Sequence, residues 1–132
     1  MRKYLSSLVL VSLVLGGASQ AMAVGGPAMI ADITHPFLVA GNELPAGQYE
    51  FRESESNPEL LVIRSISTGK ETVAFSTTRL AAREQDRYAV VFDQVGNQYY
   101  LSEIHFGDLD GFYFKGATGK HTHATIKAKK KA

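Results

Sequence analysis

The chain has 132 residues, which is too short for more than one ordinary domain. Its composition, 45% hydrophobic and 20% charged, is typical of a globular protein and excludes a wholly disordered chain. The net charge of +1 conceals a division, because residues 24–119 carry seven basic and thirteen acidic residues whereas residues 120–132 carry five lysines and no acid. An acidic body is therefore followed by a basic end.

The first 23 residues have the three parts of a secretory signal peptide. Arg2 and Lys3 give a positive start, residues 4–15 form an apolar stretch, and the small residues before position 24 suit a cleavage site. The apolar stretch is shorter than the ~20 residues needed to span a bilayer, so no transmembrane span is expected in the mature chain. We predict cleavage after Ala23 and a secreted or periplasmic location.

The mature chain reads as a series of short β-strands, because runs of β-branched and aromatic residues alternate with turns that contain Gly and Pro. It has no cysteine, so a hydrophobic core must hold the domain together. The expected strands cover residues 28–39 with an interruption at His35-Pro36, 48–53, 59–66, 71–77, the two arms of 87–106, and 112–115. Six or seven strands without a convincing helix predict an all-β fold for residues 24–118, either a small antiparallel barrel or a sandwich.

The strongest local signal is a hairpin over residues 87–106. Gly96-Asn97 separates two β-favouring runs, and glycine at the first central position suits a type II′ turn. A two-residue loop would pair Val95 with Gln98, Phe92 with Leu101, and Val90 with Glu103, whereas a three-residue loop would shift this register. The face expected in the core consists of Tyr88, Val90, Phe92, Tyr99 and Leu101.

Three segments carry a family resemblance. They are ADITHPFLV at 31–39 followed by LPAGQYEF at 44–51, LLVIRS at 60–65, and VVFDQVGNQYYLSEI at 90–104. In this order they resemble a group of small exported all-β proteins that is common in acidobacteria and related soil bacteria. The resemblance covers residues 29–106 and implies an exported β domain. It implies no activity, and no functional residue is transferred from it.

Three tyrosines are candidates for lining a ligand site. Tyr49, Tyr99 and Tyr100 lie on predicted strands, where aromatic side chains can line a cavity or a surface groove. The leading hypothesis is therefore an exported, non-catalytic module that binds a small ligand or a component of the cell envelope. The alternatives are a structural or matrix protein that acts by self-association or through its Lys-rich tail, and an enzyme of unknown class. No enzyme and no cofactor is predicted, because the sequence has no Gly-x-Ser-x-Gly elbow, cysteine nucleophile or glycine-rich phosphate loop.

One pair of charged residues falls on strands that otherwise read as apolar. In the two-residue register Glu103 shares the core face with Val90, where a carboxylate is costly unless it is paired. Arg64, within the apolar run 60–66, is the natural partner for an inward ion pair. The other interpretation is that the register differs and that both side chains reach water.

The last residues, 119–132, are predicted to form a disordered basic tail, because Ile126 is their only large apolar residue. His121 and His123 could offer imidazoles to Cu²⁺, Ni²⁺ or Zn²⁺, but a disordered tail would not hold them in place, and no metal site is predicted. The lysines suit an anionic envelope polymer as a partner. Nucleic acid is not expected as a partner of an exported protein, and the sequence does not determine the oligomeric state.

Overall fold

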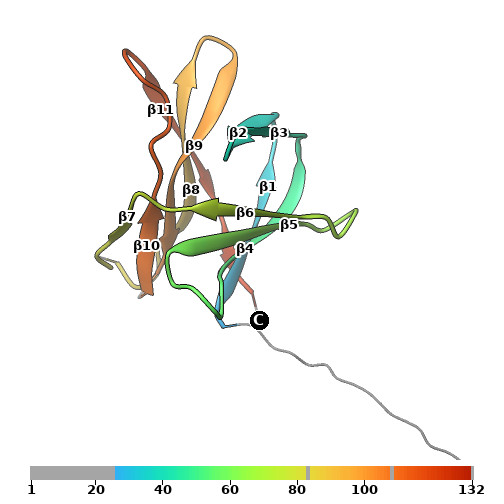
Figure 1. Ribbon diagram of the computed structural model, residues 1–132, viewed down its shortest axis with the longest axis vertical. Coiled ribbons are helices and arrows are strands. Elements are labelled where there is room, and N and C mark those ends of the chain that lie inside the picture. The colour runs from blue at the N-terminus through green and yellow to red at the C-terminus, as the bar shows by residue number, and fades with distance from the viewer. Residues whose placement is uncertain (1–25, 83, 108, 132) are drawn as a thin grey trace, which may run out of the picture.

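The computed structural model describes residues 26–82, 84–107 and 109–131. This part of the chain contains strands and turns and no helix, so the predicted all-β class is confirmed (Figure 1). The predicted signal peptide lies outside the described residues. The strands are β1 (Ala28–Ile33), β2 (Phe37–Val39), β3 (Asn42–Leu44), β4 (Gly47–Glu53), β5 (Leu60–Ser65), β6 (Glu71–Phe75), β7 (Thr78–Leu80), β8 (Tyr88–Val95), β9 (Gln98–Phe106), β10 (Leu109–Tyr113), β11 (Thr122–Lys127) and β12 (Lys129–Lys130).

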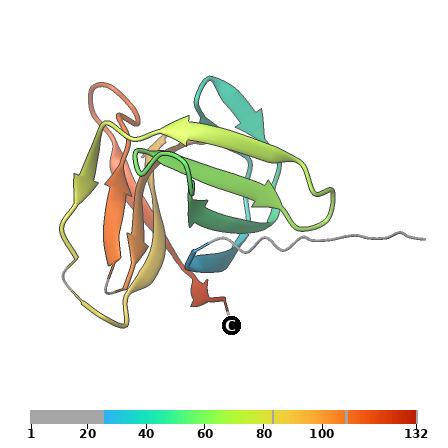
Figure 2. The same cartoon turned by 60° about the horizontal axis from the view of Figure 1, so that its bottom comes forward.

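The strands form two sheets that pack as a sandwich (Figure 2). The five-stranded sheet has the order β12-β1-β4-β5-β6. The seven-stranded sheet has the order β11-β8-β9-β10-β7, and the short β2 and β3 attach to it through β9. Its long central strands are β8 and β9 of the predicted hairpin, which therefore forms the middle of the larger sheet.

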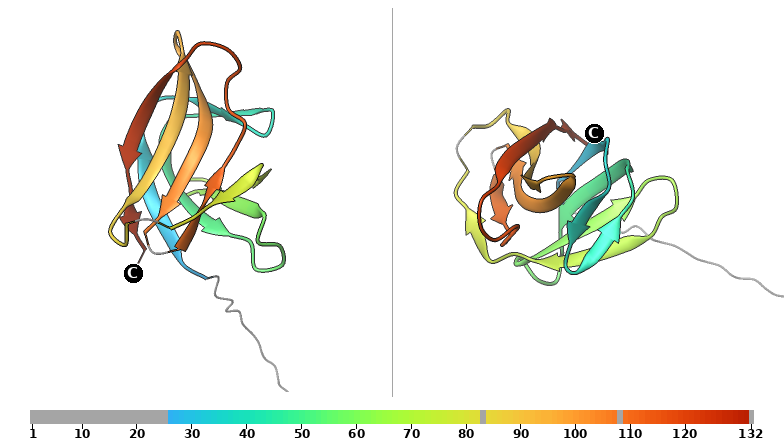
Figure 3. Two further views of the ribbon diagram at one scale, coloured as in Figure 1. Left: turned by 90° about the vertical axis from the view of Figure 1, so that its left-hand side faces the viewer. Right: turned by 90° about the horizontal axis from the view of Figure 1, so that it is seen from above.

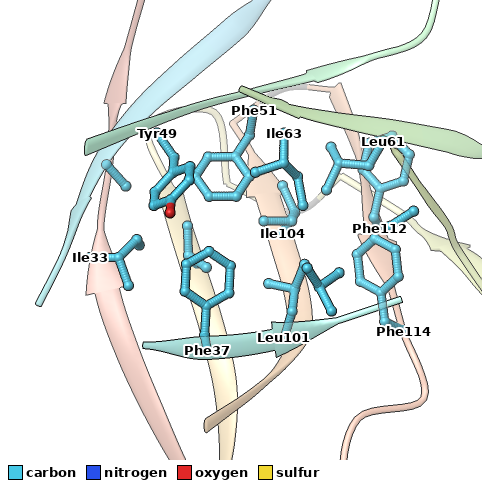
Figure 4. Packing of buried hydrophobic residues seen from close by; sticks show 14 of the residues in the cluster. Ile33, Phe37, Tyr49, Phe51, Leu61, Ile63, Leu101, Ile104, Phe112 and Phe114 are labelled. Atoms are coloured by element: carbon cyan, nitrogen blue, oxygen red, sulfur yellow. The ribbon is translucent and has the colours of Figure 1, made fainter. Parts of the chain in front are cut away.

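The core lies between the two sheets and is built from alternating strand positions. Phe51 and Ile63 face inward from the smaller sheet, and Ile104 faces them from the larger one (Figure 4). Met29 of the smaller sheet and Phe92 of the larger one belong to the same core cluster. All five side chains are fully buried. Since consecutive residues of a strand point to opposite faces, the sequence pattern of these strands fixes which side packs. A cysteine-free chain of this size therefore has a continuous apolar core.

The hairpin follows the predicted register at its tip and departs from it farther along. Val95 pairs with Gln98 and Phe92 with Leu101, as expected, but a β-bulge between Val91 and Phe92 then shifts the pairing by one residue. Val90 consequently pairs with Ile104 rather than with Glu103. The extra residue in a bulge turns the following side chains to the other face. Ile104 thus enters the core, and of the two interpretations of Glu103 the one with a shifted register and an outward side chain holds.

The turn of this hairpin gives a test of backbone conformation. Gly96 has a φ of 60°, a left-handed value that is unfavourable for a residue with a Cβ, whereas φ of Asn97 is not positive. We expect Gly96→Val to lower the free energy of unfolding by ~1–2 kcal/mol. Chemical denaturation would measure the loss, with Asn97→Val as the matched control. An equal loss in both variants would contradict the type II′ assignment.

The C-terminal segment is not a disordered tail, contrary to the prediction. β11 pairs with β8 along six residues, and β12 pairs with β1 at the edge of the other sheet (Figure 3). Between them the Ala128 N–H donates a 2.9 Å hydrogen bond to the Tyr88 carbonyl. At the end of the segment Lys131 Nζ donates a 3.1 Å hydrogen bond to Oε1 of the buried Glu50. The basic end therefore crosses from one sheet to the other and closes one side of the sandwich.

Candidate metal centre

Strand pairing between β8 and β11 brings one carboxylate and two imidazoles together. Asp93 on β8 lies directly opposite His123 on β11. His121 precedes β11 by one position and is two residues from His123, a spacing that places both side chains on one face of an extended segment. The three residues therefore form one cluster, in which the nearest ligand atoms all lie within 4.8 Å of one another.

Asp93 is the buried member of this cluster. Its side chain is 6% exposed, and its Oδ2 accepts a 3.1 Å hydrogen bond from the Ala117 N–H. Its Oδ1 is buried and accepts no hydrogen bond from the described residues. Instead, His123 Nδ1 lies 3.1 Å from Oδ1, and His121 Nε2 lies 3.5 Å from it. A buried carboxylate oxygen without a hydrogen-bond donor lowers the stability of the folded state. A cation or a protonated imidazole beside Oδ1 would offset this cost.

A backbone carbonyl orients one of the imidazoles. His121 Nδ1 lies 2.8 Å from the Gly119 carbonyl oxygen, which can only accept a hydrogen bond, so Nδ1 carries the hydrogen. In the neutral ring the other nitrogen, Nε2, then presents a lone pair toward Asp93. A hydrogen bond from the second ring nitrogen to a carbonyl is the usual support of a metal-ligating histidine.

The linker from β10 to β11 holds the carboxylate from its other side. Gly116 approaches so closely that a Cβ at this position would overlap Asp93 Oδ2. The next residue, Ala117, donates the hydrogen bond to that same oxygen. This contact needs a residue without a side chain, because ordinary Cβ atoms do not come so near a polar atom. The linker therefore fixes Oδ2 and leaves Oδ1 to face the imidazoles.

The spacing of the three ligand atoms fits a tetrahedral metal ion. Zn²⁺ binds imidazole nitrogen at ~2.0–2.1 Å and carboxylate oxygen at ~2.0–2.2 Å, so neighbouring ligands of a tetrahedral site lie ~3.3 Å apart. The distances from Oδ1 to the two imidazole nitrogens, 3.1 and 3.5 Å, lie on either side of this value. Two imidazoles and one carboxylate would leave the fourth position for water or another small ligand.

The three predicted ligand-lining tyrosines do not meet in one site. Tyr49 belongs to the core, where its hydroxyl donates a 2.6 Å hydrogen bond to the Pro45 carbonyl and burial raises the pKa of the phenol. Tyr99 stacks on His35 with ring centroids 3.5 Å apart. Tyr100 lines a surface groove. Whether any of the three contacts a ligand stays a prediction.

The predicted ion pair between Arg64 and Glu103 is not formed. Arg64 lies on the smaller sheet, where its Nη1 is 3.9 Å from Oε1 of Glu50. Glu103 lies on the larger sheet, where its Oε1 is 2.8 Å from Nε2 of His105. The bulge explains the difference, since it turns Glu103 away from the core. Each residue thus has its own partner on the outer face of its own sheet.

Comparisons of the chain with protein-family models, curated proteins and solved structures found no match. No helix in the described part of the chain is long and apolar enough to cross a membrane. Among the described residues, the Asp93–His121–His123 cluster is the group of side chains whose geometry fits a metal ion.

Sequence reasoning identified both histidines of this cluster and missed the carboxylate. The His-x-His spacing predicts two imidazoles on one face only if the segment is extended, and the segment was expected to be disordered. Asp93 becomes a ligand candidate only through the pairing of β11 with β8, which no local sequence pattern specifies. The available signal was a charged residue, Asp93, that directly follows the apolar run 88–92 within the predicted hairpin arm.

Proposed function

We propose that this protein is an exported, non-catalytic module that binds a divalent transition-metal cation between Asp93, His121 and His123, with Zn²⁺ as the best-fitting ion. The observation that supports this proposal most directly is the buried Asp93 Oδ1, which faces two imidazole nitrogens and accepts no hydrogen bond from the described residues. A cation would satisfy all three groups at once, because imidazole nitrogen and carboxylate oxygen are both good zinc ligands.

The exposure of the ligands suits reversible binding. Asp93 and its Oδ2 contacts belong to the buried framework, whereas the side chain of His123 is 59% exposed. An ion could therefore enter and leave from the solvent side without unfolding the sheet. The site would suit the capture or delivery of a metal ion outside the cytoplasm, where the predicted signal peptide would send the chain.

Zinc titration of the mature chain, residues 24–132, tests the proposal. We expect one Zn²⁺ per chain by isothermal titration calorimetry, and we expect the dissociation constant to rise at least ~100-fold in Asp93→Asn and in His121→Ala. Asp93→Asn keeps the shape of the side chain and an oxygen that can accept from Ala117, so it removes mainly the charged ligand.

His105→Ala is the matched control, because it removes an imidazole that is paired with Glu103 and lies outside the cluster. Its zinc affinity should equal that of the unmodified chain. Unchanged affinity in Asp93→Asn would contradict the proposed site, since the two histidines alone would then hold the ion.

A further inference from the structure

A groove of about 530 Å³ runs along the outer edge of β6. Its volume lies within the ~300–1,000 Å³ that is usual for small-molecule sites. One wall comes from β6 and the residues after it, and the other comes from β2, β9 and the linker that follows β10. Its apolar lining includes Leu38, Val39, Val73, Phe75, Tyr100 and Phe114.

The edge of β6 leaves large apolar side chains uncovered. Among the described strands β6 pairs only with β5, so its other edge borders the groove. Val73 is 49% exposed and Phe75 is 66% exposed. They lie on either side of the buried Ala74, so both point away from the core. Exposed apolar residues beside an apolar-lined hollow often mark a binding site. The groove is therefore suited to an apolar chain.

The charge of the groove indicates the kind of head group that such a ligand carries. Lys115 is the one charged residue among its lining residues, and no described aspartate or glutamate lines it. A single cation at a mostly apolar site favours a ligand with one anionic group and disfavours a cationic one.

We propose that the groove binds a medium-chain carboxylate, with the apolar chain against Val73 and Phe75 and the carboxylate beside Lys115. This site goes beyond the proposed metal centre and does not depend on it. The two sites adjoin at Gly116, which lines the groove and also approaches the carboxylate of Asp93. They use different side chains for binding, so each can be removed without the other.

Calorimetric titration with decanoate tests the proposal on the mature chain, with decyltrimethylammonium as a probe that has the same chain and the opposite charge. Both are used below their micelle concentrations. We expect one decanoate per chain and weaker binding of the cation. Phe75→Ser should weaken decanoate binding at least about tenfold, because the apolar contact is lost. Lys115→Met should weaken it roughly two- to fivefold and should not weaken binding of decyltrimethylammonium.

Two controls separate this site from other effects. Val95→Ser changes an exposed apolar residue at the hairpin tip and should leave decanoate binding unchanged. Asp93→Asn should also leave it unchanged, which distinguishes failure of this site from failure of the metal centre. Circular dichroism of each variant establishes that the fold is retained.

Three results would overturn the proposal. The first is an absence of saturable decanoate binding, and the second is equal binding of decanoate in the unmodified chain and in Phe75→Ser. The third is an unmodified chain that light scattering shows to be a dimer, that binds no decanoate, and that becomes a monomer when Phe75 is changed to Ser. In that case a second copy of the chain would occupy the edge of β6.

Discussion

Deletion of residues 119–132 is expected to lower the thermal midpoint of the domain sharply or to prevent folding. The deletion removes β11 and β12 and makes β8 and β1 the new sheet edges. It also removes Ala124, Ile126 and Ala128, which pack against the core. Full burial of an isoleucine contributes ~1.5–3 kcal/mol, so the partly buried Ile126 contributes a share of this, and each lost hydrogen bond contributes ~1 kcal/mol. The sum is a large part of the ~5–15 kcal/mol that stabilises an ordinary domain.

Thermal melts followed by circular dichroism, with a chelator present, would measure this effect without a contribution from metal. The control changes Lys127, Lys129 and Lys130 to Gln, which removes three charges and keeps both strands. Its midpoint should stay close to that of the full mature chain, because exposed charges contribute little. A truncated chain with an unchanged midpoint would show that β11 and β12 do not contribute to stability.

Local composition could not predict this segment correctly, because its stability comes from partners far away in the chain. Residues 122–127 contain a single large apolar side chain, too little to order an isolated segment. In the folded domain the pairing with β8 supplies backbone hydrogen bonds for six residues. Ala124, Ile126 and Ala128 also alternate with polar residues, a period-two pattern typical of a half-buried strand. That pattern was present in the sequence, but small residues made it weak.

The fold class and the central hairpin were predictable for a different reason. Gly96-Asn97 and the flanking β-branched and aromatic residues act over a few positions, so local chemistry decides them. The bulge at Val91 and Phe92 was not predictable, because either neighbouring register gives an acceptable alternation. The two registers differ in whether Ile104 or Glu103 lies in the core. The folded domain takes the register that buries Ile104, because the opposite sheet covers this position with apolar side chains. The wrong expectation for the Arg64–Glu103 pair follows from that single residue of register.

The candidate metal centre was likewise predictable only in part. Both histidines could be named from sequence, since their spacing is a local property. Their carboxylate partner could not, because Asp93 meets them only after β11 pairs with β8. A metal ion at this site would link the C-terminal segment to the body of the domain. If the ion binds only the folded state, it would raise the free energy of unfolding by ~2.7 kcal/mol at a free ion concentration 100 times the dissociation constant.

Phe92→Ala is expected to lower the free energy of unfolding by ~3–5 kcal/mol, the range for removal of a large aromatic side chain from a core. Phe92 is fully buried, and its ring lies edge-on to those of Phe37 and His35 at centroid distances of 5.4 and 4.9 Å. It also lies opposite Leu101 on β9 and Ala124 on β11, so its loss would leave a cavity on the core side of the larger sheet. Elements from both ends of the chain border this cavity, which limits how far it can collapse.

Urea denaturation of the mature chain would measure this loss, with Val95→Ala as the control on the same strand. Val95 is an exposed apolar residue, and a change there should alter stability by no more than ~0.5 kcal/mol. Far-UV circular dichroism in the absence of urea would show whether Phe92→Ala still folds. A variant that is destabilised no more than Val95→Ala would contradict the assignment of Phe92 to the core and, with it, the opposite orientation of the neighbouring Asp93 on which the metal centre depends.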